Sequence, residues 1–163
     1  RQGSGLKVLS SGEADCIAIA GMGASTIISI LEDDMDVAQS AKLLVLQPMA
    51  GAASLRAWLC SHGWQLAAEE LVDDAPHFYE IIAAKRGSAP VYSAAEYAVG
   101  PLLLAQEHPL LGKQLERQLA TCRQLLENMG RSERARASEK YKEIEALKAE
   151  LEVLQNGKRS DSK

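Results

Sequence analysis

The stretch Cys16-Ile17-Ala18-Ile19-Ala20-Gly21-Met22-Gly23-Ala24-Ser25 decides how the rest of the sequence is interpreted. Residues 16–20 are all small or β-branched and apolar, which predicts a parallel strand covered on both faces. Gly21 and Gly23 then allow a sharp turn that a ligand can approach closely. A helix over 24–32 follows, because its isoleucines recur at helical spacing. Since ligands of open α/β sheets lie beyond the carboxyl ends of the strands, this turn is the first candidate site.

The elements that follow predict one half of an α/β domain. Residues 42–46 form a second buried strand that ends at Gln47-Pro48, and an amphipathic helix over 54–59 turns Leu55, Trp58 and Leu59 inward. Residues 64–72 and 78–85 then indicate an antiparallel hairpin. The order strand, helix, strand, helix, hairpin is that of the second half of a doubly wound sheet.

Two further segments of this half carry predictions of their own. Residues 1–6 are interpreted as the tail of a strand that enters a glycine turn. The acidic run 32–36 is predicted to be a solvated loop and not a metal site, because adjacent carboxylates do not converge on a cation.

The composition changes after Gly87-Ser88-Ala89-Pro90. A short helix broken at Gly100-Pro101 comes first, and a long amphipathic helix over 109–129 follows it. Ser132 is predicted to cap a second long helix. That helix carries apolar residues at heptad-like spacing, which are Tyr141, Ile144, Leu147, Leu151 and Leu154. We therefore expect an antiparallel, coiled-coil-like helical hairpin.

These patterns divide the chain into four parts. Residues 1–87 form a partial Rossmann-like domain, 88–92 a linker, 93–156 a helical domain and 157–163 a flexible tail.

Charge and composition exclude several classes of protein. Residues 1–90 carry 6 Lys/Arg and 11 Asp/Glu, whereas residues 91–163 carry 12 Lys/Arg and 11 Asp/Glu. Only the second half therefore offers basic patches. Three scattered cysteines without CxxC spacing argue against a disulfide framework and a zinc site. No apolar run approaches membrane-spanning length and no signal peptide is visible, so we expect a cytoplasmic protein without a membrane or metal partner.

The glycine turn also allows a dinucleotide-binding interpretation. Residues 21–26 resemble the dinucleotide fingerprint, but Thr26 stands at its third glycine position, and Gln47 replaces the acidic residue that holds a ribose. An NAD-binding Rossmann domain is therefore the weaker alternative.

Several motifs, taken in order, point to one family. They are Arg1-x-Gly3-x-Gly5-Leu6, the strand and turn at 17–23, Leu46-Gln47-Pro48, Leu55-Arg56-x-Trp58-Leu59, His62-Gly63-Trp64 and Phe78-Tyr79-Glu80. This series resembles the bacterial TrmK family, whose members methylate N1 of adenine-22 in tRNA with S-adenosylmethionine. The resemblance implies a class I methyltransferase sheet followed by a C-terminal coiled-coil-like domain.

The resemblance also implies site residues. Gly5 and Leu6 would line the adenine of the cofactor, and Gly21, Met22 and Gly23 would offer backbone groups where the methyl donor meets the target base. Gln47 and Pro48 lie beside that place on the substrate side. Family members often have Asn at the next position, whereas this chain has Met49. We assign no catalytic acid or base.

The family's first strand, with its acidic glycine turn, and the acidic residue that holds the ribose have no counterpart here. The chain begins at Arg1, so we expect an N-terminally truncated methyltransferase that binds S-adenosylmethionine weakly or not at all. Micromolar binding in calorimetry would contradict this expectation.

The predicted tip of the helical hairpin is basic. Arg131, Arg134 and Arg136 gather there with Lys140 and Lys142, which suggests contact with tRNA phosphates. The alternative is a non-enzymatic interaction module, in which the leucines of the second helix face another chain and the hairpin self-associates.

Overall fold

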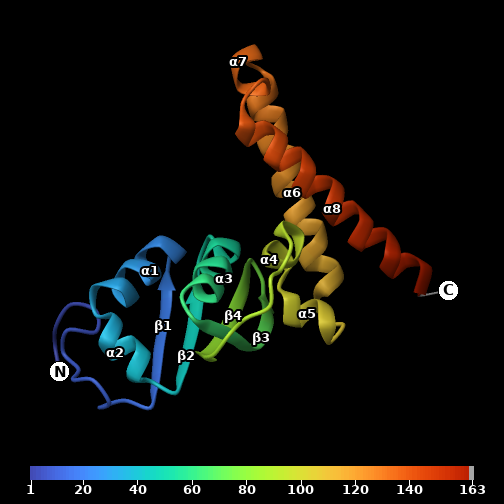
Figure 1. The fold of residues 1–163 in the computed structure, drawn as a ribbon. Helices are drawn as coiled ribbons and strands as arrows, with labels where there is room; N and C mark the ends of the chain where they lie inside the picture. Colours follow the sequence, from blue (N-terminus) through green and yellow to red (C-terminus); the bar gives the residue numbers. More distant parts are fainter. Residues whose placement is uncertain (162–163) are drawn as a thin grey trace. The chain divides into compact units, whose positions relative to one another are not determined.

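The computed structural model describes residues 1–161, with side chains described as far as residue 157. It contains two compact units, Arg1–Tyr92 and Ser93–Lys163, and each is described by itself (Figure 1). The first unit includes 88–92, the stretch that the sequence predicts as a linker.

The first unit is a four-stranded mixed sheet with helices. Its elements are β1 (Cys16–Met22), α1 (Ala24–Asp33), α2 (Met35–Ser40), β2 (Leu43–Pro48), α3 (Ala52–Ser61), β3 (Trp64–Asp74) and β4 (His77–Arg86). The strand order is β1-β2-β4-β3, in which β1 and β2 are parallel and β4 runs antiparallel to β2 and β3. The predicted order of strands, helices and hairpin is confirmed, and α2 is added to it.

One face of the sheet carries the core of this unit. Ile17 and Ile19 of β1 and Leu44 and Leu46 of β2 are buried, and so are apolar residues of α1 and α3, which contact each other. The alternate residues of β1, from Cys16 to Ala20, are exposed. The prediction that β1 is covered on both faces is therefore wrong, because the helices of the described chain pack on one face and β1 lies at the edge of the sheet.

The first nine residues form turns instead of the predicted strand tail. Residues 4–9 form two local turns, in which the Lys7 N–H donates to Ser4 O at 3.3 Å and the Leu9 N–H to Leu6 O at 2.9 Å. No strand of the described chain lies beside this segment, so its backbone groups bond locally. Leu6 is nevertheless buried, at 5% exposure.

The acidic run 32–36 is helical and not a loop. It spans the end of α1 and the start of α2, with Asp34 between them. Glu32 accepts a hydrogen bond from Trp58 Nε1 at 2.8 Å, and Asp36 lies in the first turn of α2, where the helix dipole favours a carboxylate. Within residues 1–161, the structure shows no group of three or more potential metal ligands.

The second unit is helical. Its elements are α4 (Ala94–Val99), α5 (Pro101–Ala105), α6 (Leu111–Gly130), α7 (Glu133–Arg136) and α8 (Glu139–Asp161). Ser93 caps α4 in a reciprocal capping box with Glu96, and Gly100-Pro101 separates α4 from α5 as predicted. None of the helices described up to residue 161 is both long and apolar enough to cross a membrane.

The two long helices α6 and α8 pack along each other. Buried residues on these helices include Leu115, Leu119 and Cys122 of α6 and Ile144 and Leu151 of α8. The heptad-like spacing therefore marks the packed face of α8.

One sequence prediction for this unit needs correction. Ser132 caps the short helix α7, where its hydroxyl accepts from the Ala135 N–H, and the second long helix begins only at Glu139. A four-residue helix thus intervenes between the long ones. α8 extends through residues 157–161 of the segment predicted as a flexible tail, and residues 162–163 lie outside the described part.

Candidate functional site

The turn after β1 is open on its outer side. Gly21 adopts a left-handed φ of 78°, and the ladder between β1 and β2 is irregular there, between Ala20 and Met22. A Cβ placed on Gly21 would meet no atom within 4 Å, and one on Gly23 would meet only the Ser25 hydroxyl, at 4.0 Å. The space that a side chain would occupy on Gly21 is therefore open to a ligand.

Three hydrogen bonds join this turn to the loop after β2. The Gly21 N–H donates to Gln47 Oε1 at 2.9 Å, the Met49 N–H to Met22 O at 2.9 Å, and the Ala24 N–H to Ala50 O at 2.9 Å. The structure thus brings the predicted residues Gly21, Met22, Gly23, Gln47 and Pro48 to one place. Gln47 is half-buried and Pro48 is buried, so only the former has a side chain that reaches the opening.

Several backbone groups of the turn are already engaged. The Gly21 N–H and Met22 O take part in the bonds to the second loop, and Gly23 O accepts from the Thr26 and Ile27 N–H groups of α1, each at 3.1 Å. What the turn offers a ligand is mainly space and a fixed position. The side chains beside it in the described chain, Gln47 and Met49, do not titrate near neutral pH.

Gly51 belongs to this site although sequence analysis did not single it out. It precedes α3 with a φ of 79°, and a Cβ there would lie 3.0 Å from Ala24 Cβ and 3.2 Å from Ser54 Oγ. The starts of α1 and α3 approach each other at this glycine. The only sequence signal was the run of small residues Ala50-Gly51-Ala52 after the second strand.

The other predicted glycine turn lies further along α1. A Cβ on Gly5, whose φ is 57°, would come within 3.4 Å of Ile30 Cγ2. Ile30 stands seven residues after Gly23, which is about 10 Å along a helix. Leu6 is buried, so only its backbone is available to a ligand. The structure does not place Gly5 and Leu6 at the open turn.

The three predicted arginines belong to the second unit. Arg134 and Arg136 lie on α7 and are exposed, and Arg131 precedes it with a weak pair to Glu127 at 3.7 Å. Ser132 begins α7 by accepting from the Ala135 N–H at 3.4 Å. The short helix therefore gathers exposed guanidinium groups at the end of the long helices.

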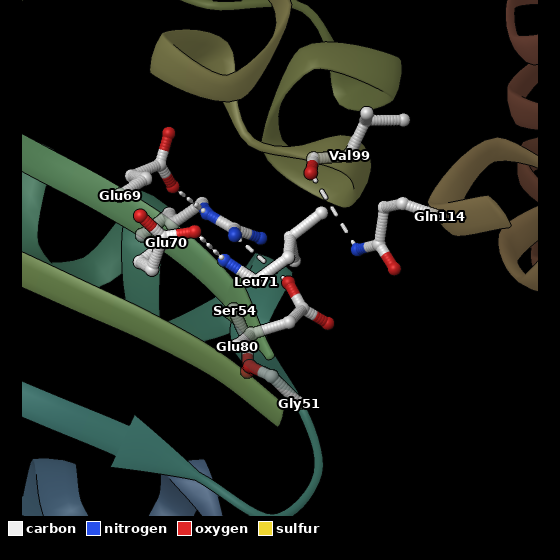
Figure 2. A network of polar contacts seen from close by, with 9 residues as sticks. Gly51, Ser54, Glu69, Glu70, Leu71, Glu80, Val99 and Gln114 are labelled. Atoms are coloured by element: carbon white, nitrogen blue, oxygen red, sulfur yellow. Dashed lines mark hydrogen bonds and ion pairs between the residues drawn. The ribbon is translucent and has the colours of Figure 1, made fainter. Parts of the chain in front are cut away.

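Sequence analysis also missed a buried ionic network below α3. Arg56 is fully buried; its Nε donates to Glu69 Oε1 at 2.5 Å and its Nη2 to Glu80 Oε2 at 2.8 Å. The side chains of Glu69 and Glu80 are 0% and 16% exposed. Figure 2 shows both carboxylates with the ion pairs they make. The network ties α3, and with it the loop between β2 and α3, to the β3–β4 hairpin.

With this geometry in place, comparison with known proteins identifies the family. Residues 1–156 match the family model described as TrmK, tRNA (adenine(22)-N(1))-methyltransferase. The chain belongs to the TrmK family.

Known relatives agree with this assignment. The Bacillus subtilis (strain 168) tRNA (adenine(22)-N(1))-methyltransferase is 30% identical over 159 residues, which are 94% of this chain and 66% of the relative. A protein of the NADB-Rossmann superfamily from Streptococcus agalactiae superposes with a TM-score of 0.80 at 27% identity, over 95% of this chain and 66% of the other. The Rossmann-like fold class is therefore confirmed.

A third relative was solved with a ligand. The Streptococcus pneumoniae protein Sp1610, in complex with S-adenosyl-L-methionine, matches with a TM-score of 0.77 at 26% identity, over 95% of this chain and 67% of that one. This TrmK chain thus spans about 66% of the length of the first relatives it matches.

Proposed function

We propose that this TrmK chain takes part in transferring a methyl group from S-adenosyl-L-methionine to N1 of adenine-22 in tRNA. The observation that carries the proposal is the open Gly21 turn, fixed by Gln47, in a chain that matches the TrmK model over residues 1–156. The family match favours this activity over NAD binding.

The reaction asks little of ionising side chains. Adenine N1 is itself a nucleophile, and S-adenosyl-L-methionine supplies a methyl group already activated on a sulfonium. The residues of this chain contribute orientation and close approach, which can account for most of the rate of such a transfer. A turn without titrating side chains beside it suits this task.

The open turn fits the reacting end of the cofactor. Gly21 and Gly23 leave room for the donor, and Met22 is proposed to form part of its wall. Gly5 and the backbone of Leu6 are proposed to face the adenine of the cofactor, and Gln47 and Pro48 to support the target base. Each of these roles rests on the family resemblance together with the positions described above.

The tRNA is proposed to bind through the exposed cations around α7. Arg131, Arg134 and Arg136 present guanidinium groups that can neutralise phosphates. We infer that the protein acts in the cytoplasm, where tRNA is available.

Deletion of the gene tests the proposed function. We expect tRNA from cells without it to lose N1-methyladenosine at position 22, read as the disappearance of a reverse-transcription stop and by mass spectrometry. The wild-type gene should restore the mark, whereas a gene carrying Gly21→Leu, which fills the opening, should not. Persistence of the modification in the deletion strain would rule the function out.

Self-association is a second proposal for the helical unit. Leu125 on α6 and Val153 on α8 are 43% and 72% exposed, outside the face that the two helices share. Sedimentation of the chain at increasing concentration tests it, because a dimer that dissociates on dilution is expected. Leu151, by contrast, is fully buried within one chain and is not available to a partner.

A further inference from the structure

Met49 is an exposed apolar residue at the opening of the Gly21 turn. Its exposed fraction is 55%, although its backbone is firmly held by the hydrogen bond to Met22 O at 2.9 Å. Long flexible thioether side chains are well suited to irregular apolar surfaces and make favourable contacts with aromatic rings. The exposed thioether is available for such a contact at the candidate site.

The side chain of Gln47 links Met49 to the turn. Because the Gly21 N–H is a donor, it must face Oε1 of the amide, and this leaves Nε2 on the other side. Nε2 lies 3.5 Å from Met49 Sδ, a weak acceptor. The thioether is therefore oriented by its own backbone and by an amide that the glycine turn itself holds.

The position that a Cβ would occupy on Gly21 is free of other atoms to 4 Å. A planar ring placed against that backbone would lie near the Met49 thioether, because the Gln47 amide contacts both the Gly21 N–H and Met49 Sδ. We propose that Met49 is a positioning residue for the adenine ring of the tRNA that is to be methylated. This inference rests on the proposed function and assigns the recognition of the target base to a particular side chain.

The ligand is an adenine ring, and two sources could supply one. The cofactor also contains adenine, but its proposed place is the Gly5 turn near Ile30, about 10 Å along α1 from Gly23. The base of the tRNA is therefore the ring assigned to Met49. A base that leaves its stack loses stacking energy, and contact with an apolar side chain restores part of it.

A tRNA transcript with 2-aminopurine at position 22 tests the assignment, because the emission of this base rises when it leaves the stack. We expect a rise on binding to the wild-type chain. Met49→Ala and Met49→Gln should both reduce it and weaken binding about two- to tenfold, the range of a sulfur–ring contact. Met49→Leu, which keeps an apolar wall, should restore most of the signal.

Val72→Ala is the matched control, since Val72 is another exposed apolar residue of the first unit, on β3. An emission rise in Met49→Ala equal to that of the wild type would overturn the inference while leaving the proposed function intact. Weaker binding of the transcript by Met49→Ala without any change in the emission of 2-aminopurine would also overturn it, because the base at position 22 would then not be the ring that Met49 contacts. A wild-type chain that does not bind the transcript would contradict both proposals.

Discussion

Arg56 and Glu69 form an ion pair in which both side chains are completely shielded from solvent. Nε of the arginine lies 2.5 Å from Oε1 of the glutamate, and Glu80 adds a second carboxylate at 2.8 Å from Nη2. Buried ions lose their hydration, so such a network is tolerated only while its partners remain complete. It anchors α3, whose first residues follow the loop at the candidate site.

Arg56→Met should strongly destabilise the protein, because it leaves Glu69 and Glu80 as uncompensated buried charges. Breaking a buried pair in this way costs about 3–5 kcal/mol. Urea unfolding followed by tryptophan fluorescence measures the loss. Lys42→Met is the control, since it breaks the exposed pair with Asp15 and should cost less than about 1 kcal/mol. Equal losses of unfolding free energy in Arg56→Met and Lys42→Met would show that the burial of the Arg56 network does not determine its contribution to stability.

Gly51→Ala should cost more stability than Gly12→Ala, although both glycines have a φ of 79°. Each substitution lowers the free energy of unfolding by about 1–2 kcal/mol, because alanine is strained in the left-handed conformation. Only at Gly51 does the new methyl group also meet Ala24 Cβ at 3.0 Å, and such overpacking adds about 1 kcal/mol or more. Thermal unfolding of the pair gives the difference directly, and a difference near zero would refute the close approach of α1 and α3.

The pKa of Glu13 should lie far below that of an ordinary glutamate. Its pKa is lowered to about 2, first by the hydrogen bond from Arg1 and then by that from the Ser10 N–H. A carboxyl with a depressed pKa contributes stability above its unfolded value near 4.5, and that contribution is lost as the pH falls toward 2. Carboxyl carbon NMR should find a midpoint near 2 for Glu13.

Arg1→Gln provides the control for this titration. It should return the midpoint of Glu13 toward the usual range, because Ser10 alone remains as a donor. As the pH falls toward 2, the free energy of unfolding of Glu13→Gln should approach that of the wild type. A normal midpoint in the wild-type protein would show that the pair with Arg1 does not form in solution.

Replacing Arg131, Arg134 and Arg136 together by Ala should weaken tRNA binding and flatten its salt dependence. Each lost phosphate contact reduces the slope of log K against log salt by about 1. Fluorescence anisotropy at several salt concentrations measures both quantities. The control removes Arg123 and Lys148, which each pair with Glu152 and should contribute less. An unchanged slope in the triple variant would exclude tRNA contact at α7.

Local patterns predicted most elements of the fold. The apolar run before Gly21, the two segments that indicate the β3–β4 hairpin, and the heptad-like spacing of α8 each carry their signal within a short stretch of chain. Where the signal depended on neighbours, the predictions were wrong. The tail of a strand expected over 1–6 has no partner strand in the described chain, and the acidic run 32–36 is helical, with Glu32 accepting a hydrogen bond from Trp58 Nε1.

The sequence by itself determined the order of the elements and the identity of the glycine turn, because periodicity and glycine act within a few residues. Only the tertiary structure decided that the Gln47 side chain bonds to Gly21, that Gly51 lets the starts of α1 and α3 approach each other, and that Arg56 is buried between two carboxylates. Each of these depends on groups that are distant along the chain and meet only when the sheet assembles.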